Sequence, residues 1–134
     1  MLLPTGIVIA LLDGEAFELY RNDGTEAEPS LIALDDPKLD AANHSAGSHH
    51  SSAGNHEGNM MDEDAHAVSA AAWLNEQVLG HKIEQLVIFA APRTLGELRK
   101  HYHKLTAQAV LKEVNKSYTG RTPDEIIAAL REPN

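Results

Sequence analysis

Two short runs of consecutive apolar residues constrain the fold of this chain more than any other feature. Residues 6–12 read GIVIALL and end at an Asp-Gly pair, and residues 85–91 read QLVIFAA and end at Pro92. Continuous apolar runs of this length are typical of strands that are buried on both faces, as in parallel sheets covered by helices. These two runs therefore predict the central strands of an α/β fold.

Three other segments predict further strands. Residues 16–20 alternate apolar and polar side chains, and residues 31–34 read LIAL. Turn signals at residues 13–14 and 22–24 indicate that the first three strands form an antiparallel meander. Residues 109–115 are the last expected strand.

Three helices are expected between and after these strands. The first follows the acidic residues 62–64 and ends at Gly80, because negative charge is favourable at a helix N-terminus and glycine commonly ends a helix. The second and third begin at capping boxes, at residues 94–97 and 122–125. Helical spacing in the second predicts one buried stripe made of Leu95, Leu98, Tyr102 and Leu105.

The expected order of elements is βββαβαβα, within a single domain that spans residues 1–134. A right-handed crossover places the fourth strand beside the first, and a meander followed by alternating helices and strands makes the sheet mixed. The fold class is therefore α/β, with a ribonuclease H-like mixed five-stranded sheet and helices packed on it. A low-complexity loop rich in His, Ser and Gly, at residues 40–61, interrupts the pattern.

The histidines of this loop raise the question of a metal site. Imidazole nitrogens are common ligands of zinc and nickel, so a divalent metal is the one cofactor that the sequence suggests. The spacing matches no established metal motif, and the Gly, Ser and Asn neighbours supply few partners that would orient the rings. We favour a solvated loop and no cofactor, with metal binding as an alternative. The candidate ligands are His44, His49, His50 and His56.

Charge is unevenly distributed along the chain. The 134 residues carry a net charge of −9 at pH 7, with −11 in residues 1–64 and +2 in residues 65–134. This balance argues against a protein that simply coats nucleic acid or anionic membrane, because binding to phosphates needs clustered Lys and Arg. Any contact with nucleic acid is therefore expected from the second half of the chain.

The sequence also bears on compartment and redox chemistry. No apolar run approaches the roughly 20 residues that span a bilayer, and the N-terminal segment lacks the pattern of a secretory signal. We expect a cytoplasmic protein without a membrane partner. The chain contains no cysteine, which excludes disulfides and thiolate catalysis.

Four strings of residues carry a resemblance to a known family. They are IALLDG at 9–14, LVIFAAPRTLGELR at 86–99, VNKSYT at 114–119 and the terminal helix at 122–130. Together they resemble the bacterial host-attachment family, named protein required for attachment to host cells. That family is similar in fold to the middle domain of archaeal and eukaryotic peptide-release factors and of Pelota, which enter the ribosome. The resemblance implies the ribosome, its tRNA or a protein as partner.

The same resemblance bears on release activity. In release factors, a Gly-Gly-Gln tripeptide between the third strand and the first helix serves the hydrolysis of peptidyl-tRNA. The corresponding segment of this chain, residues 40–61, contains no such tripeptide. The resemblance therefore implies binding to the translation machinery without hydrolysis of that type.

Basic residues begin near the end of the second apolar run and continue along the second expected helix. Ligands favour the carboxyl edge of open α/β sheets, so these side chains are candidates to bind RNA phosphates or a macromolecular partner. An ordinary solvated helix face is the competing interpretation. The candidates are Arg93, Arg99, Lys100, His103 and Lys104.

Asp13 ends the first expected strand, the strand on which ribonuclease H-like nucleases carry a carboxylate that helps to hold divalent metal. It is the candidate catalytic residue of an alternative function, a metal-dependent hydrolase acting on RNA. Such enzymes need several converging carboxylates, and an Asp-Gly hairpin explains Asp13 without chemistry. The familiar hydrolase and nucleotide-binding signatures are absent, so the leading hypothesis is a non-enzymatic binding domain.

Overall fold

A five-stranded mixed sheet forms the centre of the computed structural model, which describes residues 1–39 and 56–132. The sheet consists of β1 (Val8–Leu12), β2 (Phe17–Asn22), β3 (Leu31–Ala33), β4 (Leu86–Ala90) and β5 (Val110–Val114). Their spatial order is β3-β2-β1-β4-β5. The pairs β1–β2 and β2–β3 are antiparallel, whereas β1–β4 and β4–β5 are parallel. This order confirms the predicted α/β fold with the fourth strand beside the first.

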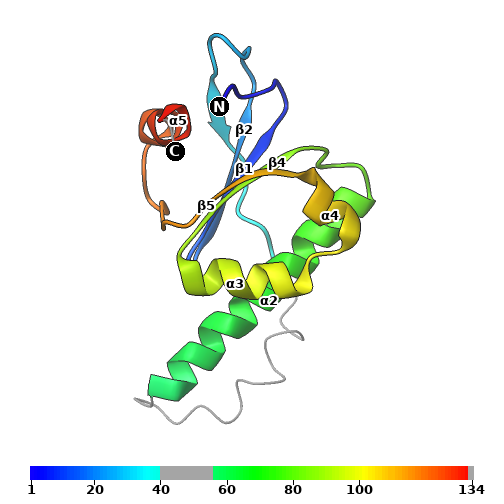
Figure 1. Cartoon of the computed structure of the whole chain (residues 1–134), viewed down its shortest axis with the longest axis vertical. Coiled ribbons are helices and arrows are strands. Elements are labelled where there is room, and N and C mark those ends of the chain that lie inside the picture. The colour runs from blue at the N-terminus through cyan, green and yellow to red at the C-terminus, as the bar shows by residue number, and fades with distance from the viewer. Residues whose placement is uncertain (40–55, 133–134) are drawn as a thin grey trace.

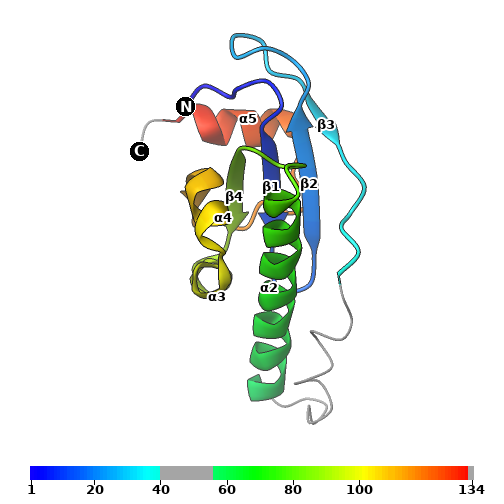
Figure 2. The same ribbon diagram turned by 90° about the vertical axis from the view of Figure 1, so that its right-hand side faces the viewer.

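Helices cover both faces of this sheet, as Figures 1 and 2 show. One face carries α2 (His56–Leu79), α3 (Pro92–His101) and α4 (Lys104–Ala109), and the other carries α5 (Pro123–Arg131). The N-terminal part of α2 extends beyond the ends of the strands (Figure 2).

The two apolar runs are central because both of their faces are covered. Every residue of β1 and β4 is buried. Side chains of successive residues in a strand point to opposite faces, so Val8, Ala10 and Leu12 pack with α2 and α3, while Ile9 and Leu11 pack with α5. An alternating amphipathic strand could not satisfy both layers at once.

Helix α2 begins earlier than the acidic residues 62–64 predict. Its backbone is helical from His56, so the predicted loop at residues 40–61 is wrong over residues 56–61. Glu57, Met60 and Met61 have high helix propensity, and the acidic residues occupy a later turn instead of the helix start. The remainder of the predicted loop, residues 40–55, lies outside the described residues.

The start of α3 also differs from the prediction. Pro92 occupies the first turn, where its fixed φ suits a helix, and Ala91 is the N-cap without a capping side chain. Thr94 therefore lies inside the helix, where it is buried. The predicted capping box at residues 94–97 is wrong because proline sets the helix start three residues earlier, with Ala91 in place of Thr94 as the N-cap.

The predicted buried stripe on this helix is only partly correct. Leu95 and Leu98 are buried and Tyr102 is half-buried, but Leu105 is 45% exposed. The helix ends at His101 because Tyr102 takes up an extended backbone, and Leu105 belongs to the short helix α4, which the sequence did not predict. The helical spacing is broken between the two helices.

The opposite face is closed by α5, whose predicted start is confirmed. The Thr122 hydroxyl accepts a hydrogen bond from the Glu125 backbone, and the Glu125 carboxylate accepts one from the Thr122 backbone. Ile126 and Leu130 are fully buried against the sheet. A reciprocal capping box with proline at the first helical position therefore begins the one helix that covers this face in the described chain.

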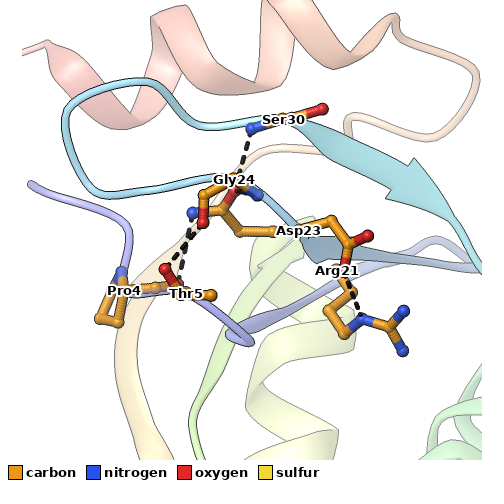
Figure 3. A network of polar contacts seen from close by, with 7 residues as sticks. Pro4, Thr5, Arg21, Asp23, Gly24 and Ser30 are labelled. Atoms are coloured by element: carbon orange, nitrogen blue, oxygen red, sulfur yellow. Dashed lines mark hydrogen bonds and ion pairs between the residues drawn. The ribbon is translucent and has the colours of Figure 1, made fainter.

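A buried polar residue organises the end of β2. The side chain of Asn22, which is fully buried, donates to the carbonyl of Leu3 at 2.9 Å and accepts from the backbone N–H groups of Gly24 and Ser30, both at 2.9 Å. Thr5 donates its hydroxyl to the carbonyl of Gly24 at 2.7 Å in the same network (Figure 3). These hydrogen bonds offset the free-energy cost of burying the amide, and they fix the loop that leads into β3.

Candidate functional site

The basic residues predicted from sequence gather on one flank of the molecule. We define the basic flank as residues 92–116, which contain α3, α4 and the edge strand β5. These residues include six lysines and arginines and two glutamates, a net charge of +4. The remainder of the chain therefore carries −13, because the whole has −9. The structure thus concentrates positive charge in one region of an acidic protein.

Glu113 of β5 binds two side chains, those of Arg99 in α3 and of Tyr102, the residue that follows this helix. Its Oε1 accepts from Nε and Nη2 of Arg99 at 2.9 and 2.6 Å, and its Oε2 accepts from the Tyr102 hydroxyl at 3.2 Å. Burial, followed by the negative charge and hydrogen bond of Glu113, raises the pKa of Tyr102, so the phenol stays protonated. The hydrogen bond and charge of Glu113 also raise the pKa of Arg99. The guanidinium is oriented while its side chain remains 58% exposed.

The other predicted cations are arranged along the same flank. Arg93 forms an ion pair with Asp64 of α2 at 2.8 Å, and Lys100 pairs with Glu97 at 2.8 Å. The hydrogen bond from Lys100 lowers the pKa of Glu97. These pairs are exposed, and such pairs contribute about 0–1 kcal/mol each, so their cations can exchange partners at little cost.

His103 and Lys104 begin α4. Nδ1 of His103 accepts a hydrogen bond from the backbone N–H of Leu105 at 3.0 Å, so this imidazole caps the short helix. The backbone N–H of His103 donates to Oδ1 of Asn75 in α2 at 2.9 Å. Lys104 is exposed beside it. The structure therefore gives His103 a helix-capping role and leaves the Lys104 side chain at the surface.

A groove lies within the basic flank, between α3, α4 and β5. Its volume is about 420 Å³, and both charged and apolar side chains line it. Arg99 and Lys112 contribute the cations, Tyr102 an aromatic ring, and Leu111 an apolar surface that is 45% exposed. No pattern in the sequence indicates this groove, because its walls come from elements that meet only in the folded chain.

Asp13 directly follows β1, at the same end of the sheet as the start of α3, because Leu12 pairs with Ala90 in parallel register. Its Oδ1 accepts from the backbone N–H groups of Glu15 and Ala16 at 2.8 and 2.6 Å, and its Oδ2 accepts from the Thr119 hydroxyl at 2.6 Å. Partial burial acts to raise the pKa of Asp13, but these hydrogen bonds outweigh it and lower the pKa. His66 of α2 lies close by, with Nε2 3.1 Å from the carbonyl of Ala16.

These contacts give Asp13 a structural role. Both carboxylate oxygens have hydrogen-bond donors, which close the β1–β2 turn and hold the segment after β5. Among residues 1–39 and 62–132, whose side chains the structure describes, no group of three or more His, Cys, Asp or Glu residues could hold a metal ion. The hydrolase alternative, with Asp13 as its candidate catalytic residue, stays a prediction.

The histidine candidates cannot be placed in the same way. His44, His49 and His50 lie outside the described residues, and His56 is known only as the first residue of α2. Metal binding by these residues stays a prediction.

No helix in the described part of the chain is both long and apolar enough to cross a membrane.

Comparison with known proteins bears on the identity of the fold. Residues 6–130 match the family model described as bacterial archaeo-eukaryotic release factor family 12. The match covers both apolar runs, the basic flank and α5. No curated protein matches the chain. The family match confirms the relation to release factors that the sequence resemblance implied, but it does not show the host-attachment name.

Proposed function

The chain belongs to bacterial archaeo-eukaryotic release factor family 12, and we propose that it is a non-enzymatic protein that binds RNA of the translation machinery through the basic flank. The observation that carries the proposal is the segregation of charge. Residues 92–116 carry +4 while the rest of the chain carries −13. A separated basic region attracts phosphates, and the surrounding negative charge opposes binding in other orientations.

The side chains of the flank suit this role. Arg99 and Lys100 are 58% and 68% exposed, and their carboxylate partners hold them at the surface of α3. Exposed ion pairs are weak, so a phosphate can replace or share the carboxylate. An arginine offers several N–H donors to a phosphate in a fixed planar arrangement. We therefore infer that Arg99 and Lys100 are the main phosphate contacts.

The ribosome or its tRNA is the partner that we favour. The family match supports this partner because archaeal and eukaryotic release factors, to which the family is related by name, act in translation. The absence of a Gly-Gly-Gln tripeptide from the printed sequence supports binding without release-factor hydrolysis. In this proposal, any role in host attachment is an indirect consequence of binding inside the cell.

Fluorescence anisotropy with a labelled single-stranded RNA tests the proposal. The double variant Arg99→Gln/Lys100→Gln removes two charges from the flank and keeps the aliphatic stems. We expect its affinity to fall about ten-fold or more, and the slope of log affinity against log salt to become shallower by about one to two.

The matched control is Arg21→Gln/Arg131→Gln, which removes two charges outside the flank. Arg21 lies on β2 and pairs with Asp23, and Arg131 is in the last turn of α5. We expect this variant to keep the affinity and salt dependence of the wild type. Equal losses in the two variants, or no RNA binding by the wild type, would overturn the proposal.

A further inference from the structure

We propose that the groove between α3, α4 and β5 holds one unstacked RNA base, and that it prefers a base with an exocyclic amino group. The inference rests on the proposed function, because the basic flank must first bring RNA to the surface. It adds that the protein distinguishes single strands from duplexes, and cytosine from uracil.

The size and lining of the groove suit a planar ligand. Its volume of about 420 Å³ falls within the usual range of about 300–1,000 Å³ for small-molecule sites. Tyr102 lines one part, and the exposed Ala107 and Leu111 contribute apolar surface. Bases bind proteins largely by stacking on aromatic rings, guanidinium planes and apolar groups. A duplex keeps its bases stacked and paired, so it cannot present one to this groove.

The charges at the groove suit the backbone of the same nucleotide. Arg99 and Lys112 line it, and Lys100 follows Arg99 on α3. A base between these residues would leave its flanking phosphates next to the cations. The groove and the phosphate contacts are therefore parts of one surface, whereas an isolated apolar groove would give no reason to choose a nucleic acid.

Glu113 supplies the expected base preference. Its carboxylate lines the groove and, among the residues that the structure describes, accepts three hydrogen bonds, two from Arg99 and one from Tyr102. A carboxylate has about four acceptor sites, so these bonds leave one acceptor site for a base. A carboxylate accepts well from the amino group of cytosine, whereas uracil presents a carbonyl oxygen at the same position. Repulsion between that oxygen and Glu113 disfavours uracil.

The test compares the affinities of the protein for four RNA ligands of similar length. Two are oligocytidine and oligouridine, the third is an oligocytidine that is abasic at every position that can occupy the groove, and the fourth is a duplex. We expect oligocytidine to bind about five-fold or more tightly than oligouridine. The abasic strand keeps the phosphates and loses the base, so it should bind as weakly as oligouridine or more weakly. The duplex should show no advantage over oligouridine.

Ala107→Leu tests the groove itself. The substitution adds side-chain volume at the groove without changing charge, and leucine has high helix propensity. We expect it to remove the preference for oligocytidine over oligouridine while retaining the salt slope. The matched control is Gln108→Leu, which changes the next residue of α4, a residue that lines a different groove; the preference should persist in this variant.

The outcomes separate the two proposals. Equal affinity for all four ligands, tighter binding of the duplex, or an unchanged cytosine preference in Ala107→Leu would overturn the groove inference and leave RNA binding by the basic flank intact. Failure of the wild type to bind any of the RNAs would overturn the proposed function, and the inference with it.

Discussion

The hydroxyl of Thr119 donates a 2.6 Å hydrogen bond to Oδ2 of Asp13, 106 residues earlier in the chain. The same segment is held at two neighbouring points. The ring centroids of Tyr118 and Phe89 are 4.9 Å apart, and the backbone N–H of Gly120 donates to Oε1 of Glu18 at 3.0 Å. Residues 115–121 are thus held against the carboxyl ends of the central strands. Asp13 stabilises both this segment and the β1–β2 turn.

Replacement of Asp13 by Asn tests this role through the pH dependence of stability. Hydrogen bonds to the carboxylate lower the pKa of Asp13 in the folded protein, so its ionised form stabilises the fold above the pKa of the unfolded chain, about 3.9. That contribution is lost as the pH falls through the lower folded pKa. We expect Asp13→Asn to be less stable than the wild type at pH 6, and the difference to shrink below about pH 4.

Urea unfolding at several pH values measures this difference. Loss of the charged hydrogen bonds should cost about 1–3 kcal/mol at pH 6. A difference in unfolding free energy that stays constant from pH 6 to pH 3 would show that the charge of Asp13 does not stabilise residues 115–121 and the turn.

The capping box of α5 gives a second prediction. Thr122→Ala removes the hydroxyl that accepts from the Glu125 backbone, and the loss of an N-cap typically costs about 1 kcal/mol. The cost should appear as reduced global stability, because α5 covers a face of the sheet through Ile126 and Leu130. Thr122→Ser keeps a hydroxyl and should stay within about 0.5 kcal/mol of the wild type in urea unfolding. Equal losses for Ala and Ser would contradict the capping role.

Two glycines are expected to respond in opposite ways to the same substitution. A Cβ at Gly24 would meet the backbone oxygen of Glu28 and lie 2.8 Å from the backbone nitrogen of Ser30. We expect Gly24→Ala to destabilise the protein by about 1–3 kcal/mol, because the loop held by Asn22 must move. Gly96→Ala places its Cβ in open space within α3 and should stabilise by about 0.5–1 kcal/mol. Thermal unfolding of both variants checks the contrast, and a stabilising Gly24→Ala would contradict it.

Local signals in the sequence predicted the sheet well and the helix ends less well. The runs that became β1 and β4 are apolar at every position because both faces of each strand are covered. The start of α3 was mispredicted because two signals competed, and Pro92 prevailed over Thr94. The break between α3 and α4 depends on contacts of Asn75 with the backbone of His101 and His103, which no local pattern reveals.

The cations of the candidate site could be predicted from the sequence, but their ion-pair partners and the groove beside them could not. The basic residues of α3 are visible as neighbours in the sequence, whereas the carboxylate partners of Arg93 and Arg99 come from other segments of the chain. Arg93 pairs with Asp64, 29 residues earlier, and Arg99 pairs with Glu113, 14 residues later. The role of Thr119 was likewise hidden, although the string VNKSYT that contains it carried part of the family resemblance. Long-range contacts determine which charges are oriented and where the groove lies.

Co-sedimentation with purified bacterial ribosomes at low and moderate salt tests the central claim most directly. The wild type and the Arg21→Gln/Arg131→Gln control should pellet with ribosomes at low salt and do so less at moderate salt, because counterions compete for the phosphates. The Arg99→Gln/Lys100→Gln variant should stay largely in the supernatant at both. Wild-type protein that stays in the supernatant at low salt, or a flank variant that pellets as well as the control, would contradict the account.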